Sequence, residues 1–193
     1  GNPAPEILSS LDLPADQGGW VRITTRASSL DVAGETNPIF GYNVWRAIPD
    51  DGGPMAPPSV TSTDRSQLLA LLSDPATATG VQVDSERALL LGLPDGEWES
   101  VGFWFATRDT LYNIAVPTKN DSTEAGIPYE VFIVTAHSST AGVFVTSAPD
   151  TGYSVDNLAP GMTGGFQGHE TASPDGLNMT WAANPVGDIW KYN

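Results

Sequence analysis

The two histidines of this chain are its best candidates for acid–base chemistry, because imidazole is the side chain that titrates near neutral pH without help. His137 is followed by Ser138, Ser139 and Thr140, which places hydroxyl groups beside it. A serine triad also needs a carboxylate behind the histidine, and the Gly-x-Ser-x-Gly turn that often carries the nucleophile does not occur. We therefore interpret His137 as a loop histidine bonded to backbone.

The second histidine, His169, is followed by Glu170 but has no further histidine at helical spacing. A zinc-protease helix needs that second ligand, and the absence of cysteine removes thiolate zinc sites and cysteine nucleophiles. We expect no zinc site.

Paired carboxylates are the device that glycoside hydrolases use. Glu97 with Glu99, or Glu124 with Glu130, could face each other in a fold, although we expect a solvated role for all four. Because no catalytic group is assigned, the sequence predicts a protein that is not an enzyme.

Calcium is the one ion for which the chain offers ligands, since it is bound by six to eight oxygens. Asp150, Asp156 and Asn157 could hold it in a hinge. The alternative is that these residues form turns by bonding their own backbone. No other cofactor is expected. Further candidate ligands are Asp50 with Asp51, and Asn120 with Asp121 and Glu124.

Tryptophans could bind carbohydrate if their rings were exposed. Trp45 and Trp104 are the candidate platforms, and Trp20 and Trp98 belong to the same half of the chain. Packing across a half-exposed sheet edge would explain the four rings equally well.

The 193 residues carry 8 basic and 23 acidic side chains, a formal charge of −15. This sign argues against nucleic acid, whose phosphates need a basic surface, and against anionic lipid. No stretch approaches the roughly 18 apolar residues of a membrane helix, so no membrane insertion is expected. The chain starts at Gly1 without an initiator methionine, which we interpret as a processed product or an excised fragment.

Alternating apolar and polar residues predict strands, most clearly in WVRITTRA and PYEVFIVTAH. Residues 49–96 interrupt this pattern, and we expect them to be a loop insertion with one short helix from Thr63 or Asp64 to Ser73. Within it, 88–93 is expected to be an extended, buried run. The predicted strands are 6–13, 20–27, 39–48, 81–83, 98–106, 109–117, 128–137 and 142–147.

A strand, a polar loop and a second strand occur twice, at 18–46 and at 175–193. In the second copy, Leu177–Trp181 followed by Asp188–Tyr192 resembles strands B and C of a fibronectin type III domain. The phrase YSVDNLAP before it is similar to the joints between tandem modules of large secreted bacterial proteins. In the first copy, Thr25 stands where the resemblance implies a core tryptophan, so we expect Trp20 or Trp45 to fill that core.

The expected fold is an all-β, antiparallel sandwich of the fibronectin type III or immunoglobulin-like kind. Residues 1–5 would be a linker, 6–148 the sandwich with its insertion, 149–160 a hinge, and 161–193 an incomplete second module.

The resemblance implies an extracellular, non-enzymatic structural or adhesive module, in a tandem-domain surface protein or a filament. The alternative is an accessory carbohydrate-binding module of a secreted hydrolase. Expected partners are copies of itself or neighbouring modules, and polysaccharide or a cell surface.

Overall fold

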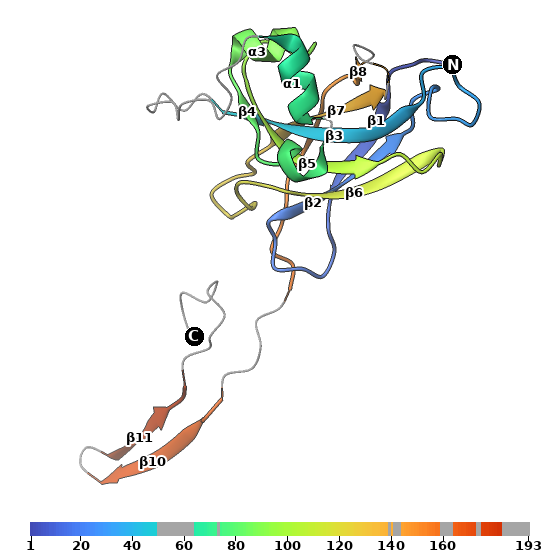
Figure 1. Cartoon of the computed structure of the whole chain (residues 1–193). Helices are drawn as coiled ribbons and strands as arrows, with labels where there is room; N and C mark the ends of the chain where they lie inside the picture. Colours follow the sequence, from blue (N-terminus) through green and yellow to red (C-terminus); the bar gives the residue numbers. More distant parts are fainter. Residues whose placement is uncertain are drawn as a thin grey trace. The chain divides into compact units, whose positions relative to one another are not determined.

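The computed structural model describes residues 1–49, 64–72, 74–138, 140, 144–158, 164–172 and 175–182 (Figure 1). The chain divides into two compact units, residues 1–156 and residues 157–193. Among the described residues, β1 to β9 and three helices belong to the first unit, and β10 and β11 belong to the second.

The first unit contains a three-stranded antiparallel sheet in the order β1-β2-β6. Its strands are Glu6–Asp12 (β1), Trp20–Arg26 (β2) and Leu111–Pro117 (β6). Burial alternates along β2 and β6, as expected for strands that turn one face to a core and the other to water. These three predicted strands are confirmed.

The larger sheet runs in the order β4-β5-β3-β7-β8, and β9 also pairs with β7. Each pairing is antiparallel. The strands predicted at β3, β4, β5, β7 and β8 are confirmed, whereas β9 lies in the expected hinge. The bounds are Ile39–Ile48 (β3), Gln82–Val83 (β4), Glu97–Phe105 (β5), Glu130–Ser138 (β7), Phe144–Thr146 (β8) and Asp150–Gly152 (β9).

The two sheets pack face to face over one apolar core, so the first unit is an antiparallel β-sandwich. Thr25 points into this core, and the ring of Tyr112 lies opposite it in register. Tyr112 packs against Tyr42 with ring centroids 4.9 Å apart. The expectation that Trp20 or Trp45 fills this core is wrong, because Trp20 is 45% exposed and Trp45 belongs to a second core.

That second core lies on the other face of the larger sheet, between the sheet and the insertion. The insertion contains α1 (Arg65–Leu72), α2 (Pro75–Ala78), β4 and α3 (Ser85–Leu90). It therefore forms a third layer, which corrects the expectation of a loop with a single helix. The predicted strand at 81–83 is confirmed by β4, and α1 confirms the predicted helix.

The expected extended run at 88–93 is also wrong, because α3 covers its first residues. Asp84 caps this helix by accepting a hydrogen bond from the Arg87 backbone N–H at 3.0 Å. Ala88 and Leu91 are fully buried in the second core. A short apolar run fits a buried helix as well as a buried strand, so the pattern alone does not separate them.

The first unit also contains most of the expected hinge. Strand β9 pairs with β7, Ser154 bridges Asp121, and the Val155 N–H donates to Asp12 at 2.8 Å. A Cβ atom on Gly152 would lie 2.8 Å from the backbone oxygen of Ser10, so glycine allows β9 to approach β1. The structure thus places residues 150–156 in the sandwich, although their composition predicts a hinge.

The second unit is described as one antiparallel hairpin, with β10 at Gln167–Ala172 and β11 at Asp175–Thr180. Strand character was expected for the second of these stretches, at the start of 175–193. The third strand expected at 188–192 lies outside the described residues.

Candidate interaction surfaces

Two of the four tryptophans of the first unit are buried by the insertion and the sheet below it. Trp45 is fully buried, and its indole N–H donates to the Thr135 hydroxyl at 3.0 Å. Trp98 is nearly as buried and donates to the Pro94 carbonyl at 3.1 Å. Trp45 therefore cannot act as a surface platform for carbohydrate, which corrects that expectation.

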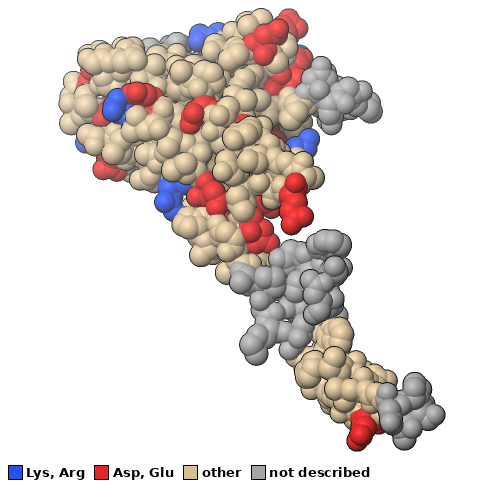
Figure 2. Space-filling model, turned by 180° about the vertical axis from the view of Figure 1, so that it is seen from behind, with Lys and Arg blue, Asp and Glu red and all other residues tan. Residues whose placement is uncertain are grey.

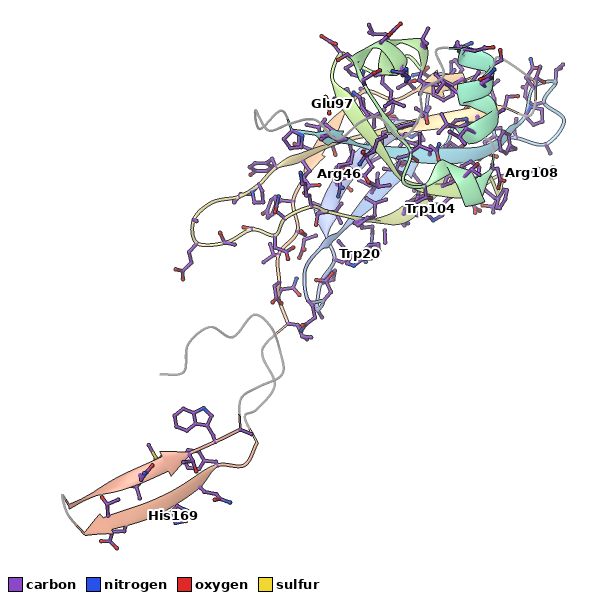
Figure 3. The ribbon with its side chains drawn as sticks, turned by 60° about the vertical axis from the view of Figure 1, so that its left-hand side comes forward. Trp20, Arg46, Glu97, Trp104, Arg108 and His169 are labelled. Atoms are coloured by element: carbon purple, nitrogen blue, oxygen red, sulfur yellow. The ribbon has the colours of Figure 1, made fainter. Side chains whose placement is uncertain are left out.

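The other two tryptophans, labelled in Figure 3, reach the surface to different extents. Trp104 is half-buried, because its ring covers Gly102, where an added Cβ would lie 2.2 Å from a ring carbon. It also packs against the core between the sheets, which leaves only part of the ring for a ligand. Trp20 is more exposed and lies at the start of β2.

His137 is a buried residue of β7 rather than a loop residue bonded to backbone. Its Nε2 lies 3.1 Å from the Thr135 hydroxyl, and its ring meets Phe144 edge-on at 4.7 Å. Burial lowers the pKa of His137 to about 4, so the ring is neutral at pH 7. This environment is that of a core histidine.

The carboxylates pair through an arginine, in a combination that differs from both expected pairs. Arg46 donates to Glu99 at 2.7 Å, and its Nε lies 3.6 Å from Glu130. The other oxygen of Glu130 accepts backbone N–H groups of Lys119 and Asn120 at 2.6 and 3.2 Å. The cluster ties β3, β5 and β7 together beside a small pocket of about 190 Å³. An arginine between the two carboxylates fits a structural role better than a hydrolytic one.

The three residues expected to bind calcium have separate surroundings. Asp150 lies in β9 and accepts a hydrogen bond from the Ser10 hydroxyl at 2.8 Å. Asp156 forms an isolated bridge with Gln17, and Asn157 begins the second unit. Across the described ranges, no group of three His, Asp or Glu side chains is arranged to hold a metal. Calcium at this joint stays a prediction, which titration calorimetry with calcium chloride can test.

The outer face of the three-stranded sheet is the first surface suited to a partner. We call it the β2 face. Residues directly opposite each other in a ladder point to the same side of the sheet, so the register identifies which side chains lie on this face. It combines exposed apolar side chains with two exposed arginines of β2. Its members are Glu6, Ser9, Leu11, Trp20, Arg22, Thr24, Arg26, Leu111, Asn113, Ala115 and Pro117.

The β2 face is unusual in a chain as acidic as this one. Figure 2 shows acidic side chains spread over the face of the first unit that it displays. On the β2 face Arg26 pairs with Glu6, and Thr24 bonds Asn113 at 2.9 Å. Arg22 has no ion-pair partner among the residues that the structure describes. An unpaired cation beside exposed tryptophan and leucine favours a partner with an acidic, apolar surface.

A cleft of about 720 Å³ opens at the Arg26 end of this face. Its walls include Leu8, Leu111 and Arg108, and the backbone of residues 2–3 is hydrogen-bonded to residues 28–29 at its edge. The volume suits a small ligand. Arg26 and Arg108 face three carboxylates in the lining, so the cleft is close to electrically balanced.

Asp31 lines the cleft and joins it to the core beneath. Its carboxylate accepts hydrogen bonds from the hydroxyls of Tyr42 and Tyr112 at 2.9 and 2.5 Å. Burial, together with the bond to Asp31, raises the pKa of both tyrosines, so both stay protonated donors. Arg108 has a φ of 64°, a left-handed conformation that is strained for a non-glycine residue.

The second surface is on the hairpin of the second unit. Leu177 and Met179 project from one face of β11, and Phe166 and Trp181 lie where the hairpin begins and ends. All four are between 41% and 65% exposed. Glu170 lies opposite Leu177 in register, so it shares that face. We call these five residues the hairpin surface.

The opposite face of the hairpin is polar. His169 and Asn178 are paired in register, and Gln167 is paired with Thr180. The hairpin is thus amphipathic, with apolar residues gathered on one side. Sequence alternation in LNMTW could have indicated this division, but not how far these apolar side chains are exposed.

None of the helices in the described ranges is long and apolar enough to span a membrane. Comparisons of the chain with protein-family models, with curated proteins and with solved structures found no match.

Proposed function

We propose that the chain is a non-enzymatic, extracellular structural or adhesive module, part of a tandem-domain surface protein or of a filament. The observation that carries the proposal is the hairpin surface, where Leu177 and Met179 on β11 and two flanking aromatic residues are exposed. A single two-stranded hairpin is at best marginally stable in water. Among the described residues of the second unit, no further strand or helix packs against this hairpin. Contact with another protein surface would supply a second layer.

The strand order of the first unit supports the fibronectin type III or immunoglobulin-like resemblance. With β1, β2 and β3 taken as strands A, B and C, β5 joins C in its sheet, β6 joins A and B, and β7 and β8 follow as F and G. An A-B-E sheet facing a C′-C-F-G sheet is the arrangement of sandwiches of this type. Modules of this kind commonly occur in tandem, in agreement with the repeat in the sequence.

Electron microscopy of the native material, with mass spectrometry of the intact polypeptide and sedimentation of the purified chain, tests the proposal. Filaments, concentration-dependent oligomers or binding to a cell surface would support it. A chain that stays monomeric at millimolar concentration and binds neither itself, cells nor matrix would contradict it.

The cleft favours a second candidate function, an accessory carbohydrate-binding module. The cleft has apolar walls, and its two arginines are offset by the carboxylates of its lining. This combination suits a neutral sugar ring better than an anion. Retention on a neutral polysaccharide column, lost on Leu111→Asp and kept on Leu89→Asp, would support this function. Leu89 is a matched control, because it is similarly exposed but lies on α3. Absence of retention on a broad panel would exclude it.

A further inference from the structure

We propose that the hairpin surface of one copy of the chain docks on the β2 face of a second copy, so that copies join head to tail. This inference rests on the proposed structural function and names the contact through which it acts.

Both surfaces are faces of antiparallel ladders with exposed apolar side chains. The β2 face presents Leu11 and Trp20 on neighbouring strands, 63% and 45% exposed. The hairpin presents Leu177 and Met179, with aromatic rings at its open end. Two sheet faces pack well when their side chains interdigitate, and that contact would turn the hairpin into one layer of a small sandwich.

The charges on the two surfaces are opposite. Arg22 lies in the middle of the β2 face, directly between Leu11 on β1 and Ala115 on β6. Glu170 lies beside Leu177 on the hairpin surface. Neither residue has an ion-pair partner among the described residues. Docking would bring the two charges into one partly desolvated contact, where opposite signs favour association and fix its register.

Pairing of like surfaces is disfavoured by the same charges. Two hairpins face to face would bring Glu170 against Glu170, and two β2 faces would bring Arg22 against Arg22. Like charges at a contact oppose binding, so the charges select the unlike pairing. Because an unlike contact leaves one free surface at each end, it generates open chains unless the rotation closes a ring.

Charge reversal on the full chain tests the inference by sedimentation velocity across a concentration series. We expect Arg22→Glu alone and Glu170→Arg alone each to raise the dissociation constant by about tenfold or more. The double variant R22E/E170R should associate about as tightly as the unmodified chain, since it again presents opposite charges. An equimolar mixture of the two single variants should associate for the same reason. Glu124→Arg, an exposed loop residue, is the control for net charge and should change little.

The outcomes separate the inference from the function on which it rests. If Glu170→Arg weakens association and Arg22→Glu does not, the hairpin binds elsewhere and the head-to-tail contact is wrong, while the structural function stands. If the double variant stays as weak as the single variants, the inference is also overturned. If the unmodified chain neither associates nor binds a surface, the proposed function itself fails. Circular dichroism and urea midpoints confirm that each variant is folded.

Discussion

Strands β2 and β11 both alternate apolar and polar residues, but the apolar residues are buried in β2 and exposed in β11. On β2, Val21 and Ile23 are fully buried, because a facing sheet covers one side of the strand. On β11, Leu177 and Met179 alternate in the same way and are exposed, because the described residues pair it only with β10. The difference shows that alternation specifies a strand locally, whereas burial depends on a second layer from elsewhere.

The largest effect that this comparison predicts is at two tryptophans. Trp45→Ala should destabilise the first unit by about 4 kcal/mol, because it removes a fully buried ring and leaves a cavity. Trp181→Ala, directly after β11, should change the free energy of unfolding of the second unit by less than about 0.5 kcal/mol. Urea unfolding followed by circular dichroism measures both. Equal costs would mean that the hairpin is packed as tightly as the core.

Two arginines provide the next contrast. Arg46→Met should cost about 3 kcal/mol, because it leaves the buried Glu130 carboxylate without its cation. Arg26→Met removes an exposed ion pair with Glu6 and should cost less than about 1 kcal/mol. Chemical denaturation at pH 7 distinguishes the two. A small effect at Arg46 would show that water reaches this cluster.

Acid should destabilise the first unit through His137. Because the pKa of His137 is lowered from 6.5 to about 4 in the folded state, the unfolded chain binds one more proton between those values. The stability that the neutral His137 ring contributes is complete above pH 6.5. As the pH falls toward 4, this part of the free energy of unfolding, about 3 kcal/mol, is lost. His137→Leu should remove this part of the pH dependence, whereas His169→Leu should retain it. Identical profiles for both variants would contradict the buried position of His137.

The smallest effect concerns the boundary of the sandwich. Gly152→Ala should cost about 2 kcal/mol, because the new methyl group would meet the backbone of Ser10. Thr151→Ala is the control in the same unit, since Thr151 is exposed on the neighbouring position of β9 and its truncation should change little. Thermal unfolding of the first unit measures both. If Gly152→Ala is as mild as the control, residues 150–152 behave as a hinge after all.

The strands were predictable because period-two patterns such as those of β2 and β7 are local. The third layer was not, because the insertion is rich in proline and glycine and its helices are short. The insertion covers Trp45. The ring that the sequence suggested as a carbohydrate platform therefore belongs to the second core. Residues 150–156 were misassigned because the pairing of β9 depends on a close approach to β1.

The sequence singled out Trp20, Glu99 and Glu130 as candidate site residues. It did not predict which residues would lie next to them in the fold. Arg46 meets both carboxylates only because β3 lies between β5 and β7, which is a matter of sheet order. The β2 face and the hairpin surface likewise follow from register and from what remains uncovered.

Hydrogen exchange of the β10–β11 amides at several protein concentrations tests most directly whether a partner covers the hairpin. We expect fast exchange in dilute solution and protection that rises with concentration, in parallel with protection of β2. Strong protection at every dilution would contradict this expectation, because the hairpin would then be stable without a second copy.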